Sequence, residues 1–361
     1  MRYGYNIDCS KLLSRAAIEV DMAPISELIR GRKVLLTGAA GSIGSELAHQ
    51  IVALQPQALC AVDQAETPLH DLSLTLGDAI TPRIANCADE SAMRRIFMEF
   101  KPDIIFHAAA YKHVPMMEAN PHAAIVNNIL ATRVLADLAV EMAVERFVMI
   151  STDKAVNPTN VMGASKRACE LYVQALESQR THFITTRFGN VLGSQGSVIP
   201  LFIEQLRQGG PLTVTHREVR RYFMLISEAC RLVLSAAALG KGGEIFAFDM
   251  GEPIRIADLA RRMISLYGNS SIRISYTGLR PGEKLYEEVL TSDETTLPGP
   301  HPKIKVARVR PAVFSEVAPA INALINLAQN PNSDAMQVVA LLKKLVPEFL
   351  SSNSHFSQLD A

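Results

Sequence analysis

The chain has 361 residues, of which 48% are hydrophobic and 20% charged. That is enough for one large or two ordinary domains with a full apolar core, and it excludes a disordered chain. The 36 basic residues balance the 36 acidic ones, so no overall charge attracts nucleic acid or anionic lipid, and neither is predicted as a partner.

The N-terminus and the cysteines exclude several further classes. No basic segment followed by an apolar one opens the chain, so we predict a cytoplasmic protein. The 5 cysteines and 9 histidines lack C-x-x-C or comparable ligand spacing, so we predict neither a disulfide framework nor a metal. The longest apolar stretches, such as 232–239, are far shorter than a membrane span, and no span is predicted.

The first predicted element is a helix over Ala23–Ile29, which the carboxylate of Asp21 can cap. From Lys33 onward, short apolar runs alternate with helical patterns. This alternation predicts an α/β fold, a Rossmann-like doubly wound parallel sheet with helices on both faces. The predicted strands are 34–38, 58–63, 83–87, 103–110, 146–152 and 182–188, and the predicted helices between them are 45–54, 91–100, 123–140 and 164–178.

After Gly189 the alternation breaks into turns rich in glycine and proline. The segment GEIFAFDM (243–250) nevertheless has the pattern of a strand of the first sheet, so the second part is interleaved with the first. Two more helices are predicted at 317–328 and 333–345, before a polar tail. We therefore divide the chain into an N-terminal appendage (1–30), a large domain (31–188, completed by about 224–250), a smaller interleaved domain (189–310), and C-terminal helices and tail (311–361).

A glycine-rich turn joins the first predicted strand to the first long helix. It has the spacing G-x-x-G-x-x-G, at which a pyrophosphate can approach the N-terminus of the helix. Asp63 ends the second strand, 19 residues past the last of these glycines, where a carboxylate would hold the adenosine ribose hydroxyls and repel a 2′-phosphate. These features predict NAD rather than NADP as cofactor, bound by Gly38, Gly41, Ser42, Ile43, Gly44 and Asp63.

Two short motifs follow the predicted fifth strand. One is Ser-Thr-Asp-Lys at 151–154, and the other is Met-x-x-x-Lys at 162–166. With HAAA at 107–110 they resemble the extended short-chain dehydrogenase/reductase superfamily, whose usual pair is Tyr-x-x-x-Lys. With longer motifs at 108–121, 151–167, 187–202, 220–224 and 278–290, the sequence resembles the UDP-N-acetylglucosamine 4,6-dehydratases, in particular the configuration-retaining branch in which Met replaces the active-site Tyr. The resemblance covers about residues 10–310.

The resemblance implies an internal redox reaction on a nucleotide sugar, for surface polysaccharide or glycoprotein sugars. Hydride passes from C4 to NAD, water is lost across C5 and C6, and hydride returns to C6. The resemblance makes Lys154 the candidate base for the C5 proton and Asp153 the acid for the C6 hydroxyl. Thr152 is assigned to the C4 oxygen and Lys166 to the nicotinamide ribose. Met162 has no transferable proton, so Asp153, Thr152 or a water must relay the C4 hydroxyl proton.

These roles require shifted pKa values. At neutral pH the pKa of Lys154 must fall and that of Asp153 must rise, each by roughly 3 units. Pairing between them opposes both shifts, whereas burial and the charge of Lys166 would lower the pKa of Lys154. We therefore predict a dry, closed pocket.

The resemblance also implies residues for the UDP-sugar and the rest of the cofactor. A diphosphate needs a few well-placed cations and amides in a protein of zero net charge. The substrate candidates are Lys112, His113, Asn190, Val191, Ser197, Arg221, Arg280 and Glu283. The remaining cofactor candidates are Asn86 and Cys87 near the adenine, Ala108, Ala109 and Ala110 after the fourth strand, and Lys166.

Assembly and the exact reaction complete the predictions. Similar proteins pair through two long helices, here 123–140 and 164–178, so a homodimer or higher homo-oligomer is expected. Two alternatives stay open: a UDP-sugar 4-epimerase or C5-inverting dehydratase, which would more comfortably use Tyr at position 162, and a catalytically inactive nucleotide-sugar-binding protein. Residues 311–361 carry no recognisable chemistry.

Overall fold

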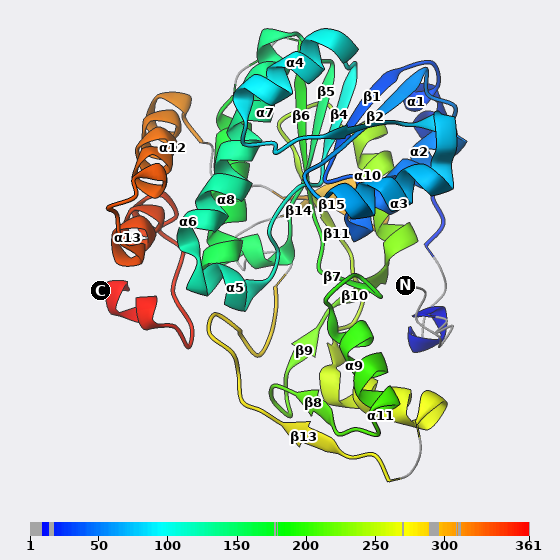
Figure 1. The fold of residues 1–361 in the computed structure, drawn as a ribbon, viewed down its shortest axis with the longest axis vertical. Coiled ribbons are helices and arrows are strands. Elements are labelled where there is room, and N and C mark those ends of the chain that lie inside the picture. The colour runs from blue at the N-terminus through cyan, green and yellow to red at the C-terminus, as the bar shows by residue number, and fades with distance from the viewer. Residues whose placement is uncertain are drawn as a thin grey trace.

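The large domain is built on a nine-stranded sheet with the order β14-β15-β11-β6-β5-β4-β1-β2-β3 (Figure 1). The computed structural model describes residues 9–13, 18–176, 178, 180–268, 271–288, 296–307, 309 and 312–360. Seven strands are parallel, and β15 pairs antiparallel with β11 and β14. The strands are β1 (Lys33–Thr37), β2 (Ala58–Asp63), β3 (Thr81–Ile84), β4 (Ile104–His107), β5 (Arg146–Ile150), β6 (His182–Arg187), β11 (Ile245–Phe248), β14 (Thr296–His301) and β15 (Ile304–Ala307).

The predicted α/β fold class is confirmed, including the return of the segment around β11 to the first sheet. Central strands such as β4 are buried throughout, as parallel strands covered on both faces should be. Two details differ from prediction. The strand β3 begins two residues early and contains Pro82, which an edge strand tolerates. The antiparallel edge formed by β15 and β14 was not predicted.

Helices cover both faces of the sheet and form two apolar cores. One face carries α1 (Ala23–Ile29), α2 (Ser42–Ala53), α3 (Glu66–Leu76) and α10 (Ile226–Leu239). The other carries α4 (Glu90–Phe100), α7 (Ala131–Glu141) and α8 (Val161–Ala175). Each of α2 and α8 begins three residues earlier than predicted, and α3 and α10 were missed. Before α1, the side chain of Asp21 accepts a hydrogen bond from Ala23 N at 2.9 Å.

The predicted helix 123–140 is a composite of α6 (Pro121–Ala124), the π-helical segment η3 (Ile125–Leu130) and α7. Asn128 in η3 donates to Ser165 Oγ at 2.9 Å, which ties the composite helix to α8. The run Pro121–Glu141 has a mean hydropathy of 1.5 and is long and apolar enough to cross a membrane, so the sequence analysis underestimated the longest apolar helix. Because 67% of the apolar window is buried inside the fold, the run has the character of a core helix.

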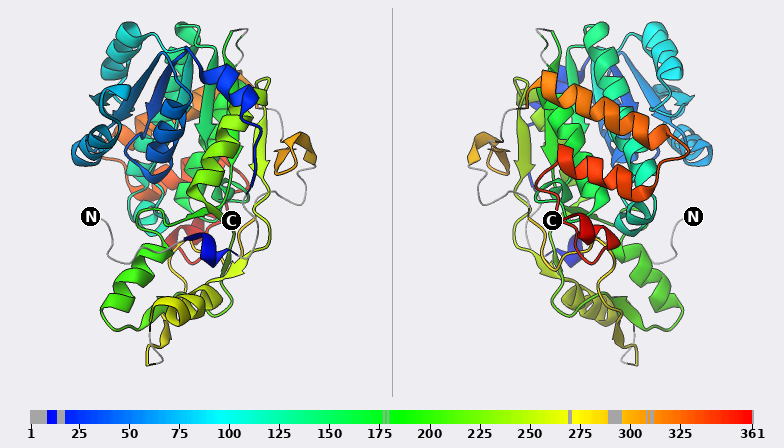
Figure 2. Two further views of the ribbon diagram at one scale, coloured as in Figure 1. Left: turned by 90° about the vertical axis from the view of Figure 1, so that its right-hand side faces the viewer. Right: turned by 90° about the vertical axis from the view of Figure 1, so that its left-hand side faces the viewer.

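A C-terminal helical hairpin covers the face expected to form the dimer (Figure 2). The hairpin consists of α12 (Phe314–Gln329) and α13 (Ala335–Leu345), which pack against α8, η3 and α6. Because η3, α7 and β6 also pack against α8, 13 of its 15 residues are buried within the same chain. The chain's own last helices therefore occupy part of the predicted pairing surface on 123–140 and 164–178, namely the part on α6, η3 and α8; residue 177 lies outside the described residues. The oligomeric state itself stays a prediction.

The smaller domain has its own apolar core, which includes Phe202, Leu259 and Met263. It is formed by α9 (Val198–Arg207), β8 (Leu212–Val214), β9 (Arg220–Arg221), β12 (Ile254–Arg255), α11 (Ile256–Tyr267) and β13 (Ile274–Tyr276). The 3-10 helix η1 (Cys9–Leu12) packs on this core through Leu12. The parallel pair β7 (Asn190–Leu192) and β10 (Phe223–Leu225) carries the chain out to the small domain and back to α10.

Candidate active site

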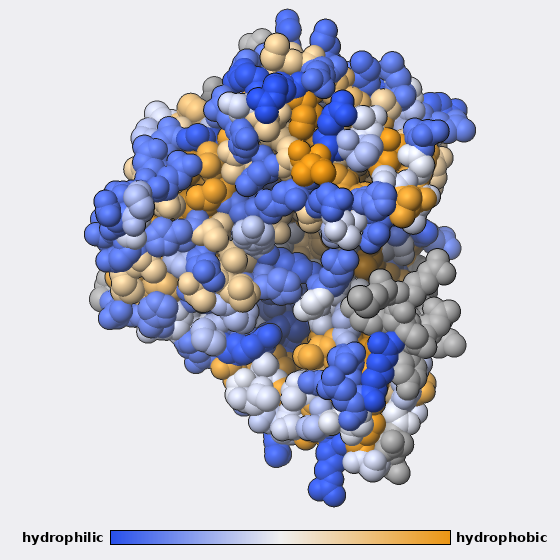
Figure 3. Space-filling model, in the orientation of Figure 1, coloured by the Kyte–Doolittle hydropathy of each residue, from blue (hydrophilic) through white to orange (hydrophobic). Residues whose placement is uncertain are grey.

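A cleft of about 1080 Å³ lies between the two domains. Figure 3 shows a hollow with a mostly hydrophilic rim at this boundary. The cleft adjoins the carboxyl ends of β1, β4 and β5, where the order of the sheet reverses and ligands of such folds bind. Its lining includes most of the predicted site residues: Gly38, Gly41, Ser42, Ile43, Gly44, Ala108, Ala110, Lys112, His113, Thr152, Lys154, Met162, Lys166, Asn190, Val191, Ser197, Arg221, Arg280 and Glu283. Asp63, Asn86, Cys87, Ala109 and Asp153 are not part of the lining.

The glycine-rich turn is packed so closely that two of its positions require glycine. Gly38 has a φ of +68°, and a Cβ there would lie 2.5 Å from Ala109 N. A Cβ on Gly44 would lie 2.0 Å from the carbonyl oxygen of Gly38. The helix α2 starts at Ser42, so its first N–H groups, which have no partner within the helix, lie beside the cleft. This arrangement suits a phosphate group.

Asp63 is held by the backbone at the end of β2. Its Oδ2 accepts from Ala40 N and its Oδ1 from Ala65 N, each at 2.9 Å. The carboxylate thus fastens the glycine-rich turn, and each oxygen keeps a lone pair for a further partner. Beyond the next strand, Asn86 Oδ1 accepts from Ala88 N at 2.9 Å, and Cys87 is buried, which raises the pKa of its thiol to about 12.

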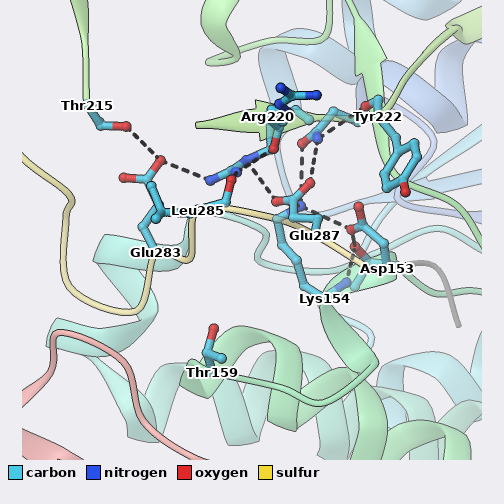
Figure 4. Close-up of polar contacts among 12 residues, drawn as sticks. Asp153, Lys154, Thr159, Thr215, Arg220, Tyr222, Glu283, Leu285 and Glu287 are labelled. Carbon is cyan, nitrogen blue, oxygen red and sulfur yellow. Dashed lines mark hydrogen bonds and ion pairs between the residues drawn. The ribbon is translucent and has the colours of Figure 1, made fainter. Parts of the chain in front are cut away.

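The catalytic loop, residues 151–160, follows β5 and contains the short helix η4 (Asp153–Ala155). Asp153 is fully buried. Its Oδ1 accepts from Thr152 Oγ1 at 2.9 Å and from Lys154 Nζ at 3.1 Å (Figure 4). Its Oδ2 is buried with no hydrogen-bond partner among the described residues. That oxygen is therefore open to a further hydrogen bond.

Glu287, which the sequence analysis missed, joins the catalytic loop to the small domain. Its Oε1 lies 2.8 Å from Lys154 Nζ and 3.0 Å from Arg221 Nε. Its Oε2 accepts from Asn190 Nδ2 at 2.9 Å. Arg221 also pairs with Glu283 at 3.1 Å, so two carboxylates four residues apart share one guanidinium. In the sequence, only the four-residue spacing of Glu283 and Glu287 within the motif at 278–290 pointed to a role for Glu287.

The pKa shifts at this cluster agree with the prediction for the aspartate and not for the lysine. Burial and the charge of Glu287 raise the pKa of Asp153 to about 6. Burial lowers the pKa of Lys154, but Asp153 and Glu287 outweigh burial, and the pKa is raised. The predicted fall is wrong because Glu287 adds a second carboxylate, and the cation that opposes them is Arg221 rather than Lys166. Burial raises the pKa of Glu287, but Lys154 and Arg221 bring it down to about 2.

The helix α8 presents Met162 and Lys166 to the cleft from adjacent turns. Asn160 caps the helix by accepting from Gly163 N at 2.8 Å. A Cβ on Gly163 would lie 2.0 Å from the carbonyl oxygen of Lys154, so α8 rests directly on η4. Both cleft residues are almost fully buried, and burial lowers the pKa of Lys166.

Cations gather where the loop after β4 meets the small domain. Burial lowers the pKa of Lys112, and the charge of Lys154 lowers it further. Burial also lowers the pKa of His113, with smaller contributions from Lys112 and Arg280. The charges of Lys112 and Arg280 thus disfavour a further positive charge on His113, and an anion bound here would offset them.

The turn 193–197 closes the cleft from the small-domain side. Gly196 has a φ of +68°, and a Cβ there would lie 2.6 Å from His113 Cε1. Gln195 N donates to Ser42 Oγ at 3.0 Å, which joins this turn to the start of α2. Ser197 precedes α9, and its Oγ is buried without a hydrogen-bond partner among the described residues. The turn thus offers polar groups to a ligand between the domains.

A buried ion network supports the catalytic loop from behind. Ser151 Oγ donates to Glu170 Oε1 at 2.6 Å. Arg187 donates to the same carboxylate from Nε at 2.8 Å and from Nη2 at 2.6 Å, and Arg167 forms an ion pair with it at 3.2 Å. Arg187, to which the sequence analysis assigned no role, is 0% exposed. The network fixes β6, α8 and the start of the catalytic loop together.

Known proteins resemble the chain over most of its length. A family model described as polysaccharide biosynthesis protein matches residues 34–309. The chain is 48% identical to the capsular polysaccharide biosynthesis protein CapD of Staphylococcus aureus over 330 residues, 89% of this chain and 55% of that protein. This chain thus spans about half the length of that relative. A UDP-N-acetylglucosamine 4,6-dehydratase (inverting) of Campylobacter jejuni is 32% identical over 277 residues, which are 75% of this chain and 80% of that protein.

Solved structures share the fold. The X-ray structure of Pen from Bacillus thuringiensis superposes with a TM-score of 0.74 at 29% identity, covering 82% of this chain and 98% of that one. DesIV, a dTDP-glucose 4,6-dehydratase of Streptomyces venezuelae solved with NAD and TYD bound, gives a TM-score of 0.64 at 24% identity, over 71% of this chain and 87% of that one. The second likeness supports the fold alone.

Proposed function

Because the chain belongs to the polysaccharide biosynthesis protein family, we propose that it is a UDP-N-acetylglucosamine 4,6-dehydratase that retains the C5 configuration. The product is UDP-2-acetamido-2,6-dideoxy-α-D-xylo-hexos-4-ulose. One observation carries the proposal: Thr152 and Lys154 line the cleft together with Met162 and Lys166, and both donate hydrogen bonds to the buried carboxylate of Asp153. The Campylobacter relative named as a dehydratase supports the reaction class.

NAD is the proposed cofactor, and the chain has residues that fit it. The cradle at Gly38 and Gly44, which a Cβ would fill, leaves space for a pyrophosphate at the start of α2. Asp63 would hold the adenosine ribose and Lys166 the nicotinamide ribose. When bound, NAD accepts hydride from C4 of the sugar and returns it to C6.

Asp153 and Lys154 supply the proton transfers. Moving one proton from Lys154 Nζ to Asp153 Oδ1, over 3.1 Å, produces a neutral amine and a protonated carboxyl together. The amine then removes the C5 proton and the carboxyl protonates the departing C6 hydroxyl. Bound sugar and cofactor would exclude water from the cleft and so favour this neutral form, because separated charges are costly where water is excluded. Thr152 holds the C4 oxygen and relays the C4 hydroxyl proton to a water as hydride leaves C4, and Met162 fills the place beside it without exchanging a proton. When hydride reaches C6, the ammonium of Lys154 returns its proton to C5, and the proton released from C4 restores the Asp153-Lys154 pair.

The UDP moiety occupies the small-domain side of the cleft. Its diphosphate meets the cations Lys112 and Arg280 beside the imidazole of His113, and the anion offsets the positive charge that gathers there. The turn ending at Ser197 contributes backbone N–H groups and a hydroxyl that has no other partner among the described residues. Arg221 is neutralised by Glu283 and Glu287, so we assign it to hold those carboxylates rather than to bind phosphate directly.

The test is direct incubation with UDP-N-acetylglucosamine and NAD, followed by mass spectrometry. The expected product is lighter than the substrate by one water. Lys154→Ala should abolish it, whereas the matched change Lys303→Ala, at a half-exposed ion pair with Asp249 outside the cleft lining, should not. An unchanged sugar in the wild-type reaction contradicts the proposal and favours an inactive nucleotide-sugar-binding protein.

An inverting dehydratase is the second candidate, because the Campylobacter relative is named as one. Met at position 162 favours retention, since the sequence departs there from the Tyr-x-x-x-Lys pattern. Nuclear magnetic resonance of the product separates the two candidates through the configuration at C5. A C4 epimer with its C6 hydroxyl intact would instead identify a 4-epimerase.

A further inference from the structure

The segment after α13 runs between two loops of the candidate site. We call residues 346–354 the C-terminal strap and residues 278–288, which carry Arg280, Glu283 and Glu287, the substrate loop. Leu350 N donates to Pro158 O and Ser352 N to Thr159 O, each at 3.1 Å. Gly282 N donates to Ser352 O at 2.7 Å. The peptide groups of one strap residue, Ser352, therefore join the catalytic loop to the substrate loop.

Gly282 is enclosed at this junction. Its φ is +76°, and a Cβ there would lie 2.7 Å from Asn160 Cβ. Its carbonyl oxygen accepts from Asn160 Nδ2 at 3.1 Å and from Thr159 Oγ1 at 3.2 Å, while its N–H is used by the strap. Because both backbone groups of Gly282 are bonded, the substrate loop is set against the catalytic loop at this point.

Side chains of the strap extend the junction. Ser354 Oγ donates to Glu118 Oε2 at 2.5 Å, and Glu118 Oε1 accepts from Val161 N, at the start of α8, at 2.7 Å. Glu118 is 3% exposed. Asn353 Nδ2 approaches the carbonyl oxygen of Glu283 at 3.4 Å. The strap thus contacts the elements that carry Met162, Lys154 and Glu287.

The strap is itself anchored at both ends. Phe349 and Phe356 are buried in the core beneath α12 and α13. Lys343 Nζ donates to Phe349 O at 3.1 Å and pairs with Asp360. Arg167, a member of the ion network behind the catalytic loop, donates to Glu348 Oε1 at 2.8 Å. Because the strap is fixed at both ends, it can fix the positions of the catalytic loop and the substrate loop, which it contacts.

We propose that the C-terminal strap is a positioning element of the nucleotide-sugar site, which keeps the substrate loop seated on the catalytic loop so that Glu283 and Glu287 stay paired with Arg221 and Lys154. The ligand assignment rests on the proposed function, whereas the loop contacts do not. Weakening the strap should impair binding of the UDP moiety and leave binding of NAD unchanged, because no strap residue lines the cleft near the glycine-rich turn.

Two strap variants test this in the full-length protein. Ser352→Pro removes the N–H that binds Thr159, and Ser354→Ala removes the hydroxyl that binds Glu118. Ser354→Thr retains that hydroxyl and should restore wild-type behaviour. Gln358→Ala is the matched control, since Gln358 is exposed and its side chain donates to Met336 Sδ in α13 rather than to either loop. For each variant, calorimetric titration gives the affinities for UDP and for NAD. Amide hydrogen exchange gives the exchange rates over residues 278–288.

The first two variants should bind UDP about five- to tenfold more weakly, the effect of losing one net hydrogen bond, with faster exchange of the substrate loop and unchanged NAD affinity. Wild-type UDP affinity and exchange in both variants would overturn the proposal, as would equal losses for UDP and NAD, which indicate general destabilisation. If the wild-type protein binds no UDP, the proposed function fails, and exchange over 278–288 still decides whether the strap holds the loop.

Discussion

Lys154 Nζ lies 2.8 Å from Glu287 Oε1, and this ion pair links the two sides of the cleft. Lys154 follows β5 of the large domain, whereas Glu287 lies on the substrate loop that returns from the small domain. With Arg221 on the other side of the same oxygen, the pair makes the acid-base cluster depend on how the domains meet. Changes at Glu287 should therefore alter chemistry and not only substrate affinity.

Glu287→Gln removes the negative charge that helps raise the pKa of Asp153 to about 6. The neutral pair can form only while Asp153 and Lys154 share one proton, so activity rises as pH rises through the pKa of Asp153 and falls as pH rises through the pKa of Lys154. The charge of Glu287 raises both pKa values, so both limbs of the kcat profile should move to lower pH in this variant. At neutral pH we expect kcat to drop by at least about tenfold, because Lys154 loses the ion pair that positions its amine for proton transfer.

The control for this change is Glu288→Gln. Glu288 Oε2 accepts from Asn157 Nδ2 at 3.0 Å on the exposed side of the same loop. Its kcat profile should match that of the wild type. If the kcat profile of Glu287→Gln had its limbs at the same pH as that of Glu288→Gln, the Glu287 carboxylate would have no influence on the pKa values of Asp153 and Lys154.

Gly163→Ala should disturb the contact between α8 and η4. The added methyl group would lie 2.0 Å from Lys154 O, so backbone must move. We expect a loss of about 1 to 3 kcal/mol in the free energy of unfolding, as in other overpacked sites, and a lower kcat, because Lys154 shifts relative to Lys166. Urea unfolding and steady-state kinetics measure the two effects. Wild-type values of both would show that the two elements are not rigidly coupled.

Much of the site was accessible from local sequence. The glycine-rich turn, Thr152 to Lys154, and Met162 with Lys166 each lie at the junction of one strand and one helix, so the alternation of elements places them at one edge of the sheet. Glu287 and the strap were missed because their partners, Lys154 and Thr159, are distant in the chain and no periodicity reports such contacts. The covered face of α8 was missed for the same reason: helix patterns at 314–345 do not reveal what they pack against.

Glu170→Gln should destabilise the fold strongly. It removes the negative charge that Arg187, which is 0% exposed, and Arg167 share, although Arg167 keeps its ion pair with Glu348. Removing one member of a buried ion network costs about 3 to 5 kcal/mol in the free energy of unfolding. Glu90→Gln, at an exposed pair with Arg94, should cost less than about 1 kcal/mol. Comparable losses in the two variants, by urea unfolding, would argue against a supporting role for the network.

Met162→Leu tests whether position 162 takes part in proton transfer. Leucine preserves volume and apolar character in this 3% exposed position. Because neither side chain exchanges a proton, we expect kcat to stay within about tenfold of wild type, the range of a repacking cost below about 1.5 kcal/mol. A thousandfold loss, with a folded protein by circular dichroism, would assign the sulfur a direct role.

The most direct test of the internal redox reaction follows one hydrogen atom. The substrate UDP-N-acetylglucosamine carries deuterium at C4, and the product is analysed by nuclear magnetic resonance after reaction with the wild-type protein and NAD. The proposed function predicts that the deuterium is found in the C6 methyl group of a 4-keto sugar. Deuterium retained at C4, or an intact C6 hydroxyl, would contradict it.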